Sequence, residues 1–207
     1  MSESFVPASD TRRKFNESQK EAWELLQTTP IVCLIGPAGT GKTHVAIEYA
    51  AYAVKKKRAS KIAYIRSPIE MGRSRVGFLP GDIAGKMAPY AATLYDIAKR
   101  MGVDEKCIQV YASGFVQGMT FEDTTVIVDE CQNFDIEEFR ALVTRLGKTS
   151  QMIFCGAPEQ DTRRIGQLPL FLDRVAGLSH VRIQRFTAED NMRHPAIVEV
   201  LDALEGA

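Results

Sequence analysis

The sequence lacks any long hydrophobic segment. It contains 207 residues, of which 45% are hydrophobic, but no run approaches the roughly 20 consecutive apolar residues that a membrane-spanning helix needs. The first residues, Met-Ser-Glu-Ser-Phe-Val-Pro, contain no apolar core of the length found in signal peptides. These absences argue against an integral membrane protein and against a secreted one, so we expect a cytoplasmic protein.

An excess of charge of either sign is also missing. Lys and Arg number 26, and Asp and Glu also number 26, so the formal net charge is zero. A nucleic-acid partner therefore cannot be inferred from a global basic field, and any such site has to come from local clusters. The candidates are residues 55–58 (Lys-Lys-Lys-Arg) and residues 73–75 (Arg-Ser-Arg). The first is more simply explained as the solvated end of a helix, where cations complement the helix dipole.

Cysteine pairs with the spacing of metal or redox centres are absent. None of the four cysteines, Cys33, Cys107, Cys131 and Cys155, is close enough to another to form a C-x-x-C motif. Cys33 and Cys155 lie inside apolar runs, and Cys107 begins another. The pattern predicts buried free thiols in a reducing compartment.

Apolar runs alternate with amphipathic segments along most of the chain. The run at 31–35, Ile-Val-Cys-Leu-Ile, is continuously apolar and is typical of a strand that is buried on both faces of a parallel sheet. Further strands are expected at 61–66, 108–111, 124–129, 151–155 and 180–184. Helices are expected at 16–27, 42–57, 86–101, 136–146 and 195–204. This alternation predicts a doubly wound α/β domain with a mainly parallel sheet and helices on both faces.

No repeat or low-complexity segment divides the chain, and we expect one domain over residues 15–207. Residues 1–14 are polar and mixed in charge, which predicts a flexible N-terminal arm. Residues 67–85, rich in Pro and Gly, cannot form one regular element, and residues 156–177 are expected to be a looser region. Pro89 fits best in the first turn of its helix.

Residues 36–43, Gly-Pro-Ala-Gly-Thr-Gly-Lys-Thr, match the P-loop pattern G-x-x-x-x-G-K-[ST] completely. The glycines let the backbone curl so that successive N–H groups point at phosphate oxygens, and the following helix adds a partly positive N-terminus. Lys42 is expected to reach the β- and γ-phosphates, and Thr43 to place its hydroxyl on Mg²⁺. The motif follows a buried strand and opens a helix, as a P-loop requires. The predicted ATP site consists of Gly36, Pro37, Ala38, Gly39, Thr40, Gly41, Lys42 and Thr43.

Two adjacent acids, Asp129 and Glu130, lie at the end of the predicted strand 124–129. The carboxyl end of a strand beside a P-loop is where Mg²⁺ and the attacking water meet the nucleotide. Asp129 is expected to hold Mg²⁺ together with Thr43, and Glu130 to orient and deprotonate water. Alone, two acids at a strand end would indicate a solvated surface, but the P-loop upstream favours the catalytic interpretation.

With these motifs the chain resembles the PhoH-like proteins, single-domain relatives of superfamily 1 helicases found in bacteria and phages. The resemblance covers about residues 16–201. Besides the P-loop it is carried by Arg66-Ser67-Pro68, Gly77-Phe78-Leu79-Pro80-Gly81-Asp82, Asp129-Glu130-Cys131-Gln132-Asn133, Arg185-Phe186-Thr187 and Arg193-His194-Pro195. It implies a RecA-like P-loop NTPase fold, ATP hydrolysis with Mg²⁺, RNA or single-stranded nucleic acid as a partner, and a homo-oligomeric ring with the hexamer as the expected size.

The resemblance also implies roles for residues outside these motifs. Gln19 would recognise the adenine edge, although many helical glutamines simply face solvent. Gln160 would sense the γ-phosphate, but this chain has Ala157 where relatives typically carry Asp, and a methyl group cannot make a carboxylate's contacts. Arg193 would serve as an arginine finger, which can accelerate phosphoryl transfer about 10³-fold or more. Because the chain is too short for a second motor domain, a neighbouring subunit would supply this arginine.

A purely structural role is an alternative for several of these residues. Arg193 can equally cap or bridge near the last helix, and the rival candidates for the finger are Arg163, Arg164 and Arg185. Residues 66–82 are expected to face nucleic acid, with Arg73 and Arg75 on phosphates. Phe78 is a candidate for base stacking, although an anchoring role for its loop is slightly favoured. His194 is expected to be a structural hydrogen-bonding residue.

The sequence therefore predicts a Mg²⁺-dependent ATPase that acts on RNA or single-stranded nucleic acid. An alternative is a regulatory module without motor activity, whose ATP state switches a partner protein. The alternative is compatible with Ala157 and with a chain too short for a second motor domain. A third hypothesis is a small-molecule kinase, against which the water-positioning Glu130 argues.

Overall fold

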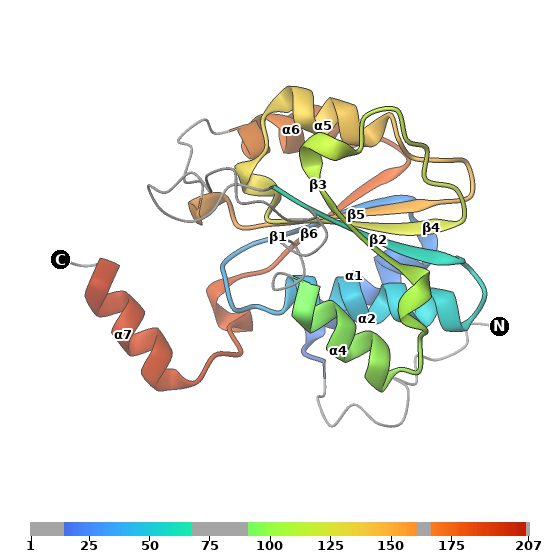
Figure 1. Cartoon of the computed structure of the whole chain (residues 1–207). Coiled ribbons are helices and arrows are strands. Elements are labelled where there is room, and N and C mark those ends of the chain that lie inside the picture. Colours follow the sequence, from blue (N-terminus) through green and yellow to red (C-terminus); the bar gives the residue numbers. More distant parts are fainter. Residues whose placement is uncertain (1–14, 68–90, 161–166, 206–207) are drawn as a thin grey trace, which may run out of the picture.

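A computed structural model of the chain describes residues 15–67, 91–160 and 167–205 (Figure 1). The predicted N-terminal arm lies outside the described residues, as do Arg73, Arg75, Phe78 and the rival arginines at 163 and 164. Within the described ranges, no helix is both long enough and apolar enough to cross a bilayer.

Six parallel strands form a single sheet in the order β3-β2-β4-β5-β1-β6. Their bounds are β1 (Ile31–Ile35), β2 (Lys61–Arg66), β3 (Ile108–Ala112), β4 (Thr124–Asp129), β5 (Gln151–Gly156) and β6 (Val181–Arg185). In register, Ile35 pairs with Gly156 and Arg66 pairs with Asp129. The carboxyl ends of the central strands therefore lie side by side at one edge of the sheet.

Helices cover both faces of the sheet, as predicted (Figure 1). One face carries α1 (Glu17–Thr28), α2 (Lys42–Lys55) and α4 (Ala92–Arg100), and the other carries α5 (Ile136–Val143) and α6 (Gln167–Val175). The last helix, α7 (Pro195–Glu205), stands away from the sheet and from the other helices (Figure 1).

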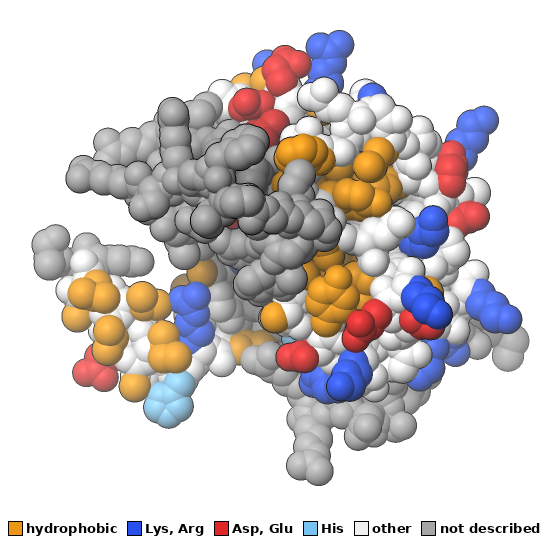
Figure 2. Space-filling model, in the orientation of Figure 1, with side chains coloured by type: hydrophobic (Ala, Val, Ile, Leu, Met, Phe, Trp, Pro, Cys, Tyr) orange, Lys and Arg blue, Asp and Glu red, His pale blue; other side chains and the backbone are white. Residues whose placement is uncertain are grey.

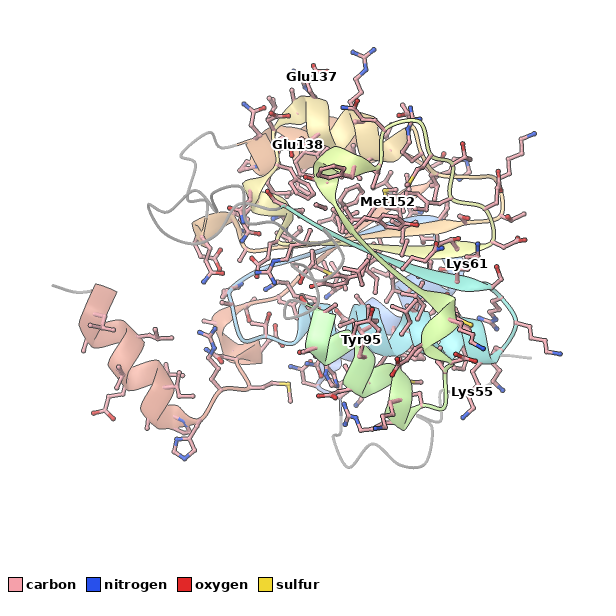
Figure 3. The ribbon with its side chains drawn as sticks, in the orientation of Figure 1. Lys55, Lys61, Tyr95, Glu137, Glu138 and Met152 are labelled. Atoms are coloured by element: carbon pink, nitrogen blue, oxygen red, sulfur yellow. The ribbon has the colours of Figure 1, made fainter. Side chains whose placement is uncertain are left out.

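Aromatic contacts join the helices within each layer. On the α1 and α2 side, Trp23 packs against Tyr49 and Tyr52 with ring centroids 5.4 and 5.3 Å apart. On the opposite side, Phe139 of α5 stacks on Phe171 of α6 with centroids 4.2 Å apart. Met152, labelled in Figure 3, belongs to the core on this second side. Both cores hold the strands in place beneath their helices.

The predicted strands and helices are all present, and most of their ends differ from the prediction by a turn or less. The predicted first turn of α4, with Pro89, lies outside the described residues. One prediction was wrong, because the looser region expected at 156–177 contains α6. Its apolar residues Leu168, Phe171 and Leu172 are buried and recur at helical spacing, a signal that the sequence offered.

The cysteines are free, as predicted, but only three of them are buried. Burial raises the pKa of the thiols of Cys33, Cys131 and Cys155, that of Cys33 to about 12, so these thiols stay protonated. Cys107 was expected to be buried in a strand. It lies instead in a short 3-10 helix (Glu105–Cys107) just before β3, where it is only half-buried.

Phe139→Ala tests the packing of α5 and α6 on the sheet. The side chain is 1% exposed and contacts three other aromatic rings, so its loss leaves a cavity that the neighbours cannot fill. We expect the free energy of unfolding to fall by about 3–5 kcal/mol in urea denaturation. Phe115→Ala is the control, since Phe115 is 58% exposed, and a similar loss in both variants would contradict this account.

Candidate active site

The P-loop leads from β1 into α2 with glycines in backbone conformations that other residues rarely adopt. Gly39 and Gly41 have φ angles of 84° and 83°. A Cβ atom on Gly41 would lie 2.4 Å from Nε2 of Gln19, closer than any real contact. The loop therefore needs glycine here for both its curl and its packing against α1.

The Lys42 ammonium is hydrogen-bonded to the loop itself. Its Nζ donates to the carbonyl oxygens of Gly36 and Pro37, each at 2.6 Å, and to Oγ1 of Thr40 at 3.3 Å. Burial lowers the pKa of Lys42, while nearby negative groups, including Asp129, oppose that shift. The side chain thus lies close to the loop backbone and to the acids at the end of β4.

The carboxylate of Asp129 accepts a hydrogen bond on each oxygen. Thr43 Oγ1 in the first turn of α2 donates to Oδ1 at 2.8 Å, and the hydroxyl of Tyr64 on β2 donates to Oδ2 at 2.5 Å. Asp129 is 6% exposed. Burial raises the pKa of Tyr64 and the charge of Asp129 raises it further, so the phenol keeps the proton that it donates.

Glu130 is held differently. Its backbone is left-handed, with φ of 54°. Gln132 Nε2 donates to its Oε2 at 2.5 Å, and Arg66 Nη2 at the end of β2 lies 3.5 Å from its Oε1. The side chains of Arg66 and Glu130 are 23% and 34% exposed. Glu130 therefore stands at the open side of the site, held by two neighbours.

Gln132 also links the ends of β4 and β5. While its Nε2 donates to Glu130, its Oε1 accepts from the backbone N–H of Ala157 at 3.1 Å. This contact at Ala157 uses the backbone amide, so the methyl side chain of that residue does not prevent it. Gln132 is 3% exposed, and its position is fixed by these contacts.

A cavity of about 450 Å³ opens at the carboxyl ends of β1, β4 and β5. It brings together most of the predicted site residues. Those that line it are Ala38, Gly39, Gly41, Lys42, Thr43, Asp129, Glu130, Gln160 and Arg193. Such a crevice at the carboxyl ends of parallel strands is where ligands bind in open α/β sheets.

Arg193 lines the cavity of its own chain. The sequence had instead led us to expect that a neighbouring subunit would supply an arginine to this cavity. The backbone N–H of Met192 donates to the carbonyl of Gly39 at 3.0 Å, which ties this segment to the P-loop. A Cβ on Gly39 would lie 2.7 Å from Nε of Arg193. One chain thus supplies both the P-loop and an arginine beside it, so the arginine no longer argues for an oligomer. Its rival Arg185 is exposed at the end of β6.

Gln19 lies behind the P-loop and is not among the described residues that line the cavity. It is 2% exposed, so the solvent-facing alternative does not hold. Its Nε2 donates to the carbonyl of Thr40 at 3.1 Å, and its Oε1 accepts from the backbone of Asn16 in a capping box that begins α1. Its Nε2 also lies 3.0 Å from Sδ of Met192, so in the structure Gln19 joins the start of α1, the P-loop and the segment before α7.

The oxygen atoms at the cavity fit a magnesium ion. Thr43 Oγ1 and Asp129 Oδ1 are hard ligands that lie 2.8 Å apart and line the cavity. In the described part of the chain no group of three or more His, Cys, Asp or Glu could hold a metal. Because Mg²⁺ is usually held by one or two protein ligands together with phosphates and waters, this sparse set is what a nucleotide-bound Mg²⁺ needs.

Two residues that position the acids were not predicted to do so from the sequence. In the sequence pattern Tyr64 is one more residue of a buried strand, and nothing in the pattern predicts the hydrogen bond from its hydroxyl to Asp129. Gln132 belongs to the Asp-Glu-Cys-Gln segment, so its place next to the acids was visible, but its two contacts depend on the approach of β5. Both residues position the acids.

Comparisons with known proteins place the chain beside one family. A family model described as PhoH-like protein matches residues 13–205. The PhoH-like protein of Bacillus subtilis (strain 168) is 32% identical over 198 residues, which cover 90% of this chain and 62% of that protein. Protein PhoH of Escherichia coli (strain K12) is 32% identical over 201 residues, 91% of this chain and 56% of that protein. The chain thus spans little more than half the length of these relatives.

Solved structures confirm the fold class. The large terminase from a thermophilic bacteriophage superposes with a TM-score of 0.63 at 12% identity, covering 91% of this chain and 49% of that one. The same terminase in complex with ATP-gamma-S gives a TM-score of 0.59 at 13% identity over 91% and 49%. With the six parallel strands and the P-loop, this likeness identifies a RecA-like P-loop NTPase fold.

Tyr64→Phe removes one of the two hydrogen bonds to Asp129 without changing the packing of β2. Because a bond to a buried carboxylate is lost, we expect the free energy of unfolding to fall by roughly 1.5–3 kcal/mol in urea denaturation. Tyr95→Phe on α4 (Figure 3) is the control and should change it little. Equal stability of both variants and wild type would show that the bond does not hold the site together.

Proposed function

This chain belongs to the PhoH-like protein family, and from that premise we propose that it binds ATP with Mg²⁺ and hydrolyses it. The observation that carries the proposal is the 2.8 Å contact between Thr43 and Asp129 in a cavity that Lys42 and Glu130 also line. These are the four groups that ATP hydrolysis on a P-loop requires.

Each group has a distinct role in the proposed reaction. Backbone N–H groups of the loop and the Lys42 ammonium would bind the β- and γ-phosphates, and Thr43 and Asp129 would hold Mg²⁺, which neutralises charge on the phosphates. Glu130 would accept a proton from the attacking water. Gln160 would contact the γ-phosphate, and the guanidinium of Arg193 would stabilise the charge that spreads over its oxygens. The terminase complex with ATP-gamma-S shows that this fold elsewhere holds such a nucleotide.

We further propose that RNA or single-stranded nucleic acid is the partner, as the family resemblance implies. Arg66 supports a link between the two sites, because it lies 3.5 Å from Glu130 and is the first residue of the segment 66–82 expected to face nucleic acid. A nucleic-acid phosphate would compete with Glu130 for the guanidinium. Release of Glu130 toward the water would then raise ATP turnover when nucleic acid is bound.

Lys42→Ala and Glu130→Gln separate binding from chemistry. We expect Lys42→Ala to lose ATP binding and turnover together, because the phosphates lose their ammonium contact. Glu130→Gln should bind ATP with an affinity close to that of wild type but lose at least about 10²-fold in turnover, because an amide cannot accept the proton. Binding is measured by isothermal titration with ATP and Mg²⁺, and turnover by phosphate release.

Glu137→Gln is the matched control for the acid. Glu137 lies at the outer surface of α5 (Figure 3), with a side chain that is 75% exposed, so this variant should behave as wild type. If Glu130→Gln hydrolyses ATP at the wild-type rate, Glu130 is not the base. If wild-type protein has no affinity for ATP with Mg²⁺, the whole proposal fails.

Turnover with and without nucleic acid tests the partner. We expect single-stranded RNA or DNA to stimulate phosphate release several-fold in wild type, and Arg66→Ala to lose that stimulation because the competition at Glu130 disappears. Arg100→Ala, an exposed arginine at the end of α4, is the control and should remain responsive. Indifference of the wild-type protein to both nucleic acids would favour the regulatory switch over a motor, and transfer of labelled phosphate to a metabolite would favour a kinase.

A further inference from the structure

Helix α7 presents an apolar stripe that no described segment of the chain covers. Ile197, Val200 and Leu204 are 49%, 58% and 70% exposed, and none of the described side chains of this helix is buried. Their spacing of three and four residues places them on one face of the helix. Figure 2 shows hydrophobic side chains along this projecting helix. A stripe of this kind on an isolated helix is suited to an apolar groove.

The described surface also contains an apolar groove, of about 400 Å³, between α5 and α6. Apolar side chains from both helices and from the turn after α6 line it, among them Val143, Phe171 and Leu178, and Leu178 is 51% exposed. Ile31 and Val181, the first residues of β1 and β6, close it at the bottom. The groove therefore lies at the amino ends of the strands.

The two surfaces are too far apart in the fold to meet within one chain. The segment before α7 is tied to the P-loop at the carboxyl ends of the strands, where Met192 donates to Gly39. The groove lies at the amino ends, beneath α5 and α6, whereas α7 projects from the other side of the molecule (Figure 1). A second copy can bring the two together, because each copy carries one helix and one groove.

The charges of the two surfaces are complementary. α7 contains three acidic residues, at positions 199, 202 and 205, and no lysine or arginine. The groove is bordered by Arg140 and Arg174 against the single acid Glu137. An acidic amphipathic helix is attracted to such a rim, while its apolar stripe fills the groove.

We propose that α7 of one copy docks in the α5–α6 groove of a second copy of this chain. The contact joins two different surfaces, so it is heterologous, and successive copies form a closed ring or an open filament. Arg193 lies two residues before α7 and lines the cavity proposed to bind ATP. Docking would therefore anchor the segment that carries this arginine to the neighbouring copy.

The test measures self-association of the full chain by sedimentation at increasing protein concentration. Wild type should form species larger than one chain. Leu204→Asp on the helix and Leu178→Asp in the groove should each weaken association at least tenfold, because a charge would enter the apolar contact. Both residues are exposed, so neither change disturbs the core. The matched controls are Ala203→Asp, which lies off the stripe of α7, and Leu170→Asp, an exposed residue of α6 outside the groove lining.

Mixing the two variants distinguishes this contact from a symmetric one. The Leu204→Asp copy keeps an intact groove and the Leu178→Asp copy keeps an intact helix, so an equal mixture should form pairs that cannot extend further. Failure of the mixture to pair would overturn the helix-in-groove contact, as would association unaffected by either change. A wild-type chain that stays monomeric at high concentration would overturn it too. ATP hydrolysis plays no part in these measurements, so their outcome is separate from that of the proposed function.

Discussion

The geometry of the site depends on the two hydrogen bonds that the Asp129 carboxylate accepts. One comes from Thr43 at the start of α2 and the other from Tyr64 in the middle of β2, while Asp129 itself ends β4. Three elements from distant parts of the sequence are thereby fixed to one buried side chain. Loss of either donor leaves an unpaired acceptor in a site with little solvent, which is costly. These two hydrogen bonds therefore fix the position of Asp129 relative to the P-loop.

The neighbouring Glu130 contrasts with this fixed residue. It is partly exposed, and one of its partners, Arg66, is partly exposed and lies at the end of an adjacent strand. A pair of this kind contributes little to stability because water screens it. It can therefore be exchanged for another partner at low cost. A rigid carboxylate suits the proposed role of Asp129 in holding Mg²⁺, and a releasable one suits the proposed role of Glu130 as a base that responds to a nucleic-acid phosphate.

Much of this arrangement could be predicted from the sequence, and the remainder has a common cause. The strands, the P-loop and the two acids are local patterns, and the parallel topology brings their ends together. Tyr64, Gln132 and the position of Arg193 depend on contacts between segments far apart in the chain, which no local pattern encodes. Gln19 shows the same limit. The apolar spacing around it predicts the helix α1, but it does not predict the hydrogen bond from Gln19 to the carbonyl of Thr40. The missed helix α6 differs, because its apolar periodicity was visible and only the surrounding glycines and prolines obscured it.

Ala157 contributes to the site through its backbone and not through its side chain. The family resemblance predicts Asp at this position, yet the contact that joins it to Gln132 is made by the backbone N–H. The series of hydrogen bonds from Glu130 through Gln132 to the end of β5 therefore does not need a carboxylate at position 157. Gln160 follows within the same turn, where its backbone N–H donates to the carbonyl of Ala157 at 2.9 Å. What the methyl group removes is a negative charge at the cavity wall, so Asp129 and Glu130 act there without a third carboxylate from this position. Any effect of Ala157 on the proposed hydrolysis should thus come from this lost charge, because the hydrogen bonds from Glu130 through Gln132 and Ala157 to Gln160 are made without it.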